Sequence, residues 1–113
     1  MADCLFCKII AGEVPSDKLY EDDLVAAILD INPRAPRHFL VLPKEHIPTA
    51  ADIRGEHGPI ITRMFSTAAR VAKEEGVAES GYRIAFNVGD DAGMSVWHLH
   101  MHVLGGHQLG PEG

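Results

Sequence analysis

The spacing of apolar residues predicts one long helix and one short helix. Between Gly58 and Glu75, apolar side chains recur at steps of three and four residues, the period of an amphipathic helix, and Gly76 is a typical residue to end it. The stretch FCKIIAGEVP (residues 6–15) shows the same period over a shorter length and stops at a glycine and a proline, which predicts a brief N-terminal helix. The expected core face of the long helix consists of Ile61, Met64, Phe65, Ala68, Val71 and Ala72.

Five other segments have the apolar patterns and bounding turns that favour strands. An acidic turn at Glu21 to Asp23 joins the first two, which predicts a hairpin, and the turn NPRAP follows them. Because short turns join most strands and a single long helix is inserted, we expect an α+β fold with an antiparallel five-stranded sheet, in preference to a doubly wound α/β fold. The expected strands are KLYEDD (18–23), LVAAILDI (24–31), HFLVLP (38–43), YRIAFNV (82–88) and VWHLHMHVL (96–104).

Length and composition indicate a single domain over residues 1–113. The chain has 113 residues, of which 46% are hydrophobic, enough for one small core. A formal net charge of −6 argues against broad nucleic-acid binding, because clustered lysine and arginine side chains hold a phosphate backbone. The start MADCLFCKII shows no secretory leader, and no stretch reaches the roughly 18 apolar residues of a membrane span. We therefore expect a cytoplasmic protein that binds neither nucleic acid nor membrane and holds any phosphate ligand locally.

Three histidines alternate with apolar residues in the last expected strand. Successive side chains of a strand point to opposite faces, so His98, His100 and His102 are expected to share one face. A surface strand has little reason to use histidine three times in succession when threonine, lysine or glutamate would serve, so the pattern favours a functional site. The residues expected on the opposite, core-facing side are Trp97, Leu99, Met101 and Val103.

These three side chains suit nucleophilic chemistry better than one shared metal ion. At about 3.4 Å per residue, His98 and His102 lie roughly 14 Å apart along a strand, whereas zinc–nitrogen bonds are about 2.0–2.1 Å long. His100 is left between two imidazoles that can orient it or bind an anion, and a neutral imidazole forms covalent intermediates near pH 7. We expect a phosphorus or an acyl centre as its target.

The loop before the histidines and the end of an earlier strand add two candidate features. The segment GDDAGMSVW contains Gly89, Gly93 and Ser95, so backbone N–H groups can approach an oxyanion and a hydroxyl can add a hydrogen bond. Such a loop by itself usually only turns the chain, but beside the histidines phosphate is the better interpretation. Asp30 either starts the turn that follows it or holds sugar hydroxyls, and the pattern leaves both roles open.

These residues resemble a known family. The motif HLHMHVL, preceded by GDDAGMSVW and followed by GG, closely resembles the signature of the histidine-triad (HIT) family. The stretches FCKIIAGEVPSDKLYEDD, LDINPRAPRHFLVLPKEH and GYRIAFNVG are similar to the rest of the HIT domain, so the resemblance covers nearly the whole chain. Among its branches the chain is most similar to the Hint group. This similarity implies the HIT-like fold, a homodimer, and hydrolysis of adenosine 5′-phosphoramidates and aminoacyl adenylates with no catalytic metal.

The resemblance also implies a role for each matching position. His100 matches the nucleophile that attacks the α-phosphorus, expels the amine and carries the nucleotide until water releases the monophosphate. His98 and His102 match its flanking partners, and His102 stands where related nucleotidyltransferases carry glutamine, which favours hydrolysis over transfer. His38 matches a further histidine of the site, and Asp30 the carboxylate that binds ribose hydroxyls. The other matches are Phe6 and Ile31 at the base, and Asn87, Gly93, Ser95 and Val96 at the phosphate, with Ser95 suited to hydrogen-bond the leaving group.

Cys4 and Cys7 form a Cys-x-x-Cys pair, which is half of a structural zinc site. His46 and His98 are the candidates to complete a Cys₂His₂ tetrahedron, and several bacterial-type relatives in the resembled family look like this. Two reduced cysteines on an apolar helix, or a redox pair, are the alternatives. If zinc takes His98, that residue braces the histidine strand and does not act as an acid or base.

Two other functions stay open at this stage: a zinc-stabilised nucleotide-binding or adaptor module with little turnover, and a Fhit-like hydrolase of dinucleoside polyphosphates. The tail GGHQLGPEG lacks the tryptophan that is typical of the Hint group, so it does not define specificity for the amine. His57 and His107 are expected at the surface. Arg34 and Arg37 are expected to be solvated rather than to contact a leaving group.

Overall fold

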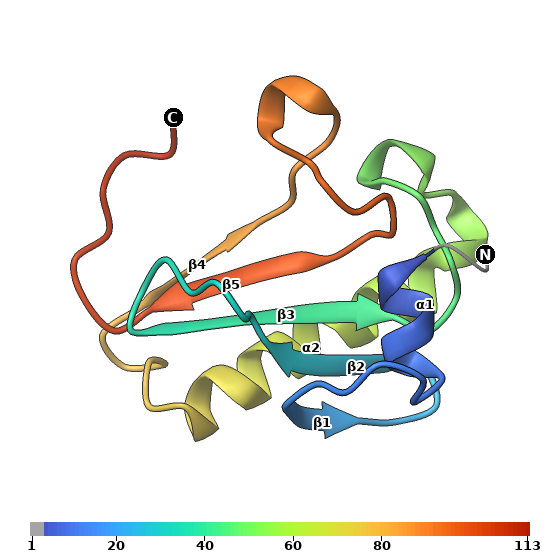
Figure 1. Cartoon of the computed structure of the whole chain (residues 1–113). Coiled ribbons are helices and arrows are strands. Elements are labelled where there is room, and N and C mark those ends of the chain that lie inside the picture. The colour runs from blue at the N-terminus through green and yellow to red at the C-terminus, as the bar shows by residue number, and fades with distance from the viewer. Residues whose placement is uncertain (1–3) are drawn as a thin grey trace.

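The computed structural model, which describes residues 4–113, places a helix on each face of a five-stranded antiparallel sheet (Figure 1). Residues 1–3, part of the segment considered for a leader, lie outside the described residues. Helix α1 is Leu5–Ile10 and helix α2 is Gly58–Glu74. In spatial order the strands are β1 (Lys18–Glu21), β2 (Val25–Leu29), β3 (Arg37–Pro43), β5 (Met101–Gly105) and β4 (Tyr82–Ala85).

The α+β class, the antiparallel sheet and the pair of one long and one short helix are therefore confirmed. The expected hairpin is the antiparallel pair of β1 and β2. Both β1 and β4 end earlier than predicted, at Glu21 and Ala85. Over residues 4–113, neither helix combines the length and the apolar character that crossing a bilayer requires.

The central strands β2 and β3 are buried on both faces, which is why their sequences are almost continuously apolar. One face packs against α2 and forms the larger core. The other face packs against α1, which contributes Phe6 and Ile9. The sheet residues of the larger core include Val25, Ala27, Phe39, Val41, Met101 and Val103, and those on the α1 side are Ile28, Leu40 and Leu42.

Helix α2 has the predicted extent but a slightly different buried face. The buried residues are Met64, Thr67, Ala68, Val71 and Ala72, spaced at i, i+3, i+4, i+7 and i+8. Phe65 lies one position outside this stripe, so its side chain is 46% exposed and its assignment to the core was wrong. Its ring lies 6.3 Å from that of Phe86, beyond the end of β4.

The last strand is shorter than predicted, because it begins at Met101 instead of Val96. Before Met101 the chain is held by the loop after β3: the Leu99 N–H donates to the carbonyl of Ile47 at 2.6 Å. The alternation of faces survives from Leu99 onward, since Leu99, Met101 and Val103 are buried in the larger core. Trp97 precedes this ordered pairing and is 49% exposed, so its assignment to the core was wrong.

Candidate active site

A cavity of about 560 Å³ lies on the face of the sheet that carries α1. Its walls come from α1, the end of β2, the loop from Asp30 to Arg34, the loop before β5, and β5 itself. Nine of the predicted site residues line it: Phe6, Asp30, Ile31, Asn87, Gly93, Ser95, Val96, His100 and His102. His38 lies directly behind this lining, whereas His98 belongs to a separate cluster described below.

His100 has one ring nitrogen occupied and one free. Its Nδ1 lies 2.7 Å from the backbone carbonyl oxygen of His98, and because a carbonyl can only accept, Nδ1 carries the proton. The Nε2 of a neutral His100 therefore keeps its lone pair. Burial lowers the pKa of His100, and its ring packs against that of Phe6 in a T-shaped arrangement with 4.9 Å between ring centroids. These contacts prepare a neutral imidazole to act as a nucleophile.

His102 is held in one tautomer by a chain of hydrogen bonds. The backbone N–H of Arg34 donates to Nδ1 of His38 at 3.1 Å, so the proton of a neutral His38 is on Nε2. That Nε2 lies 2.9 Å from Nδ1 of His102 and donates to it, which places the His102 proton on its own Nε2. Burial, followed by the neighbouring His100, lowers the pKa of His102 to about 4. His102 is therefore a neutral donor beside His100, with 5.0 Å between the ring centroids.

Strand pairing accounts for this contact. His102 on β5 is opposite Leu40 on β3, and His38 on β3 is opposite Leu104, so the two histidines are diagonal neighbours on one face. Burial also lowers the pKa of His38, whose Nε2 is 3.3 Å from a carboxylate oxygen of Asp30.

Asp30 performs the structural role and is also in position for the functional one. One carboxylate oxygen accepts the backbone N–H of Asn32 at 2.8 Å, which is the turn-forming role expected from the sequence. The other oxygen faces His38, and the side chain lines the cavity. Phe6 is buried, whereas the side chain of Ile31 is 88% exposed at the rim. The two residues predicted to hold the base thus lie at different depths.

The loop before β5 uses some of its own backbone donors. The N–H of Gly93 donates to the backbone carbonyl of Asp90 at 2.9 Å, and the N–H of Met94 donates to the backbone carbonyl of Gly89 at 3.1 Å. Gly93 has φ = 79°, a left-handed conformation that favours glycine. Because these two N–H groups are engaged within the loop, the loop donors available to an oxyanion begin at Ser95, whose exposed side chain lines the cavity.

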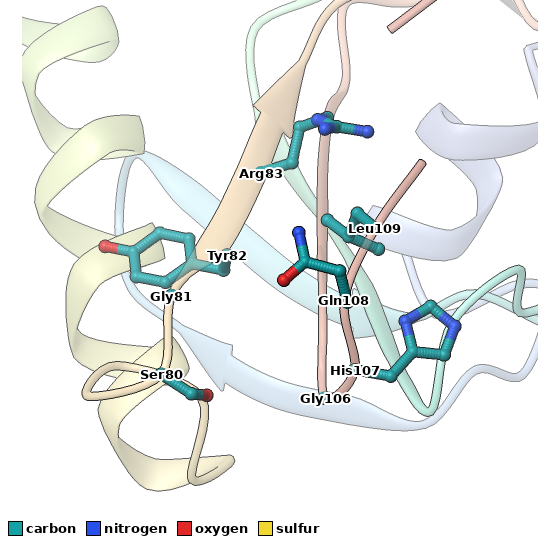
Figure 2. Close-up of a pocket in the computed structure, with 8 residues that line it drawn as sticks. All are labelled: Ser80, Gly81, Tyr82, Arg83, Gly106, His107, Gln108 and Leu109. Carbon is teal, nitrogen blue, oxygen red and sulfur yellow. The ribbon is translucent and has the colours of Figure 1, made fainter. Parts of the chain in front are cut away.

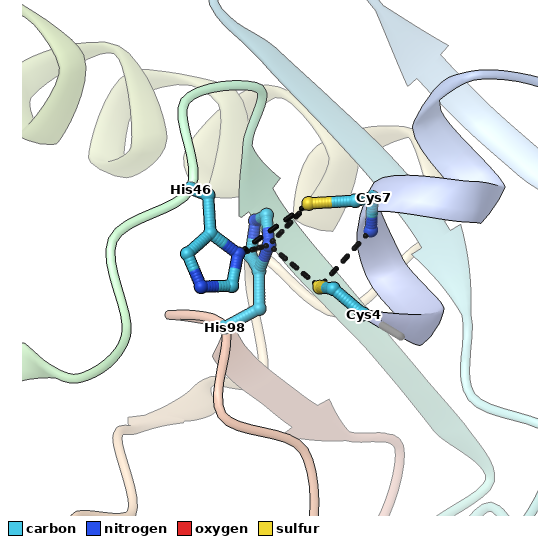
Figure 3. A group of neighbouring side chains, drawn as sticks. All are labelled: Cys4, Cys7, His46 and His98. Atoms are coloured by element: carbon cyan, nitrogen blue, oxygen red, sulfur yellow. Dashed lines mark hydrogen bonds between the residues drawn. The ribbon is translucent and has the colours of Figure 1, made fainter. Parts of the chain in front are cut away.

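A second cluster joins the cysteine pair to two histidines (Figure 3). Cys4 and Cys7 come from the start of α1, His46 from the loop after β3, and His98 from the segment before β5. The Nδ1 of His98 lies 3.3 Å from the sulfur of Cys4, 3.6 Å from that of Cys7 and 3.2 Å from Nδ1 of His46. The sequence-predicted ligand set is therefore brought together at one point.

The chemistry of these donors fits a tetrahedral zinc ion. In a zinc tetrahedron with bonds of about 2.0–2.3 Å, neighbouring ligand atoms lie about 3.3–3.8 Å apart, which is close to the separations in this cluster. The Nε2 of His98 lies 2.8 Å from the carbonyl of Pro43 and must donate to it, so the lone pair of a neutral ring is on Nδ1, facing the cysteines. Burial and the adjacent Cys4 raise the pKa of the Cys7 thiol to about 11, which keeps it protonated unless a cation binds.

Asp30, His38 and His102 also bring three potential metal ligands close together. The hydrogen bonds argue against a metal at this place. Because Nδ1 of His38 accepts the Arg34 N–H, Nε2 of His38 must keep its proton and has no lone pair to give. This group is better described as a hydrogen-bond relay.

A second hollow, of about 510 Å³, lies where β4 and the segment after β5 run past each other (Figure 2). Most of its lining is exposed, and it includes Arg83, His107 and Gln108. His107 is exposed, as predicted. The described residues around this hollow include no buried imidazole and no acidic side chain, so the catalytic candidates are those of the first cavity.

His57, expected at the surface, is buried. Its Nδ1 accepts the N–H of Arg54 at 2.9 Å, and its Nε2 donates to the carboxylate of Glu45 at 3.1 Å. It therefore ties the start of α2 to the loop that carries His46. Spacing gave no signal for this role, because both partners belong to loops.

Comparisons with known proteins agree with this geometry. The model of the HIT domain matches residues 11–109. The chain is 49% identical to the purine nucleoside phosphoramidase of Escherichia coli strain K12 over 109 residues, 96% of this chain and 92% of that protein. A HIT family hydrolase from Clostridium thermocellum superposes with a TM-score of 0.96 at 47% identity, covering 99% of this chain and 97% of the other.

A zinc-bound histidine triad family protein from Mycobacterium smegmatis is more distant, with a TM-score of 0.78 and 35% identity over 92% of this chain and 75% of that one. The chain therefore belongs to the HIT family, and its relatives include a purine nucleoside phosphoramidase and a HIT family hydrolase.

Proposed function

We propose that this chain hydrolyses purine nucleoside phosphoramidates, with His100 carrying the nucleotide between two half-reactions. The observation that carries the proposal is the bond from Nδ1 of His100 to the His98 carbonyl, which leaves Nε2 of His100 as a free nucleophile in the cavity wall. The name and the 49% identity of the Escherichia coli phosphoramidase support the same reaction class.

In the first half-reaction, the lone pair on Nε2 of His100 forms a bond to the α-phosphorus. The phosphorus–nitrogen bond breaks, and the amine leaves with its electron pair and takes a proton from water at the open side of the cavity. The N–H on Nε2 of His102 and the hydroxyl of Ser95 are the neighbouring donors for the phosphoryl oxygens and the leaving group.

In the second half-reaction, a water molecule attacks the same phosphorus. The bond from phosphorus to Nε2 of His100 breaks, the lone pair returns to the ring, and the water proton replaces the one consumed before. The products are the nucleoside monophosphate and the free amine. Because the cavity holds His100 beside the substrate, a fixed nucleophile makes the first attack in place of a water molecule from solution.

The remaining lining residues provide the nucleotide contacts in this proposal. Asp30 accepts hydrogen bonds from the ribose hydroxyls, with its second oxygen beside His38. Phe6 and Ile31 pack against the base, from the floor and the rim of the cavity. Asn87, Gly93, Ser95 and Val96 surround the phosphoryl group from the opposite loop.

Rapid quench of the chain with adenosine 5′-phosphoramidate, followed by intact-protein mass spectrometry, tests the function. We expect an adenylyl adduct that forms and decays with turnover, and that His100→Ala abolishes. His107→Ala removes an exposed imidazole outside the cavity and should leave the adduct unchanged. Tight nucleotide binding with no adduct and no turnover would instead identify a binding module and overturn the proposal.

We also propose that Cys4, Cys7, His46 and His98 hold one structural zinc ion. The convergence of two sulfurs and two Nδ1 atoms supports it, together with the proton of His98 on the Pro43 side. Zinc would link α1, the loop after β3 and the segment before β5. Its coordination of His98 would also steady the carbonyl that orients His100, while taking no part in the reaction itself.

The homodimer expected from the family resemblance is a further part of the proposal. Strand β4 pairs with β5 on one side, and within residues 4–113 no strand pairs with its other edge. Beyond the end of β4, Val88 is 43% exposed, and Phe65, whose ring centroid lies 6.3 Å from that of Phe86, is 46% exposed. A second copy would cover both the edge and these side chains. Light scattering coupled to gel filtration should give the dimer mass, and a monomer would refute this assembly.

A further inference from the structure

Arg34 is exposed, as its sequence context predicted, and it also lies at the cavity. It follows β2 in the loop that leads to β3, and its side chain lines the cavity. One guanidinium nitrogen, Nη2, is 3.4 Å from Nδ1 of His102, while the backbone N–H of Arg34 donates to His38. Arg37, three residues further along, is not part of the lining and instead lies 3.8 Å from the carboxylate of Glu75.

Arg34 also differs from most other arginines in having no carboxylate partner among the described residues. Among the described residues, four of the five other arginines lie within 4 Å of a carboxylate: Arg37, Arg54, Arg63 and Arg70. The fifth, Arg83, has no such partner either, but it lines the second hollow and not this cavity. The guanidinium of Arg34 has an imidazole nitrogen as its neighbour and no such carboxylate within the described chain. A guanidinium has five N–H donors, so most of those on Arg34 are free for an anion.

The charges around the cavity point the same way. Among the described residues that line it, Arg34 is the only arginine or lysine, and Asp30 is the only acidic side chain. The hydrogen-bond relay keeps His38 and His102 neutral, because Nδ1 of each ring accepts a hydrogen bond and therefore carries no proton. These two rings can donate to a phosphoryl oxygen but do not neutralise its charge. A phosphoryl group in this cavity therefore meets one permanent cation.

We propose that the Arg34 guanidinium binds the phosphoryl group of the nucleotide and gives this site its preference for nucleotides over neutral nucleosides. The inference rests on the proposed function, since it takes a nucleotide as the ligand. Arginine suits this task because its planar donors match two phosphate oxygens at once, and because it stays charged at every relevant pH.

Calorimetric titration of the full chain with adenosine 5′-monophosphate and with adenosine tests the proposal without requiring turnover. Arg34→Gln removes the charge and keeps the backbone N–H that holds His38. We expect it to weaken monophosphate binding roughly 10- to 150-fold, the range for a hydrogen-bonded charge, and to change adenosine binding less than about twofold. Arg34→Lys should retain most of the affinity for the monophosphate. Arg37→Gln is the matched control and should behave as the unmodified chain.

Salt gives a second readout. The affinity of the unmodified chain for the monophosphate should fall with rising ionic strength, and Arg34→Gln should reduce that dependence. Unchanged monophosphate binding by Arg34→Gln would overturn the proposal. So would an equal loss for both ligands, which would mean that Arg34 acts only by positioning His102, and so would a lack of monophosphate binding by the unmodified chain. Arginine-dependent binding with no adduct on His100 would leave this inference standing while the proposed hydrolysis fails.

Discussion

The Nε2 atom of His38 lies 2.9 Å from the Nδ1 atom of His102, and this buried hydrogen bond decides which nitrogen of His102 carries its proton. The donor is itself fixed, because the other nitrogen of His38 accepts the backbone N–H of Arg34. A loop between two strands thereby sets the protonation of a ring on a third. The predictions below follow from this relay and from the other fixed contacts around the site.

Removing the donor of the relay should slow catalysis while leaving the nucleophile in place. In His38→Ala, the buried Nδ1 of His102 loses its shorter hydrogen bond, and only the 3.4 Å contact from Nη2 of Arg34 still favours the proton on Nε2. Such a loss costs about 1–3 kcal/mol, so we expect kcat to fall roughly 5- to 150-fold. In His38→Gln the side-chain amide can donate from nearly the same place, so it should recover part of the rate. Steady-state kinetics on adenosine 5′-phosphoramidate would measure this, and equal rates for the alanine and glutamine variants would contradict it.

The buried His102 should make the folded chain less stable in mild acid. Its pKa is lowered to about 4 by burial and by His100, His38 and Arg34, with Asp30 acting in the opposite direction. An unfolded histidine has a pKa of about 6.5, so below that pH the unfolded state binds more protons. The stabilising contribution is therefore complete above pH 6.5 and is lost as the pH falls toward 4. Between pH 7 and pH 5 the loss from this residue should be about 2 kcal/mol.

Urea unfolding at these two pH values would measure the loss. His102→Gln cannot gain a proton, so its free energy of unfolding should depend less on pH than that of the unmodified chain. His107→Gln, at an exposed position, serves as the control and should preserve the dependence. If the free energy of unfolding depends on pH equally in the unmodified chain and in His102→Gln, the lowered pKa of His102 is refuted.

Elemental analysis of protein purified without a polyhistidine tag should find one zinc per chain. Cys7→Ala removes a ligand and should abolish stoichiometric zinc. A ligand that binds only the folded state stabilises it by about 2.7 kcal/mol when present at 100 times its Kd, so a chelator should lower the melting temperature by several degrees. The same chelator should not lower the melting temperature of Cys7→Ala further. A folded, metal-free preparation whose melting temperature ignores added zinc would dismiss the site.

Gly106, directly after β5, should tolerate substitution less well than the glycines of the tail. Gly106 has φ = 104°, and a Cβ there would lie 2.9 Å from the Cβ of Pro36, in the loop that also carries Arg34. Gly106→Ala should therefore cost about 1–3 kcal/mol and lower the melting temperature by several degrees. A Cβ at Gly110 would meet nothing within 4 Å, so Gly110→Ala is the matched control and should melt with the unmodified chain. Equal melting temperatures for the two variants would contradict this prediction, because they would mean that the chain accommodates a Cβ at position 106 without strain.

Local periodicity was sufficient for most of the architecture. The apolar spacing between Gly58 and Glu75 specified α2, because a helix repeats every 3.6 residues whatever it packs against. The continuous apolar runs specified the central strands β2 and β3. The error at Phe65 arose because periodicity gives the width of an apolar stripe, and the neighbouring sheet decides where that stripe is centred.

The sequence by itself determined that His100 and His102 lie on one face, that Cys4 and Cys7 can act together, and which family the chain resembles. These properties depend on residues a few positions apart, whose relative geometry the backbone sets. Only the tertiary structure decided the partners: His38 donates to His102 across 64 positions of sequence, and His98 turns to Cys4 across 94. The position of Arg34 at the cavity and the burial of His57 also depend on contacts between distant segments. Which side chains meet across strands and loops depends on the packing of the whole chain, and no local pattern contains that information.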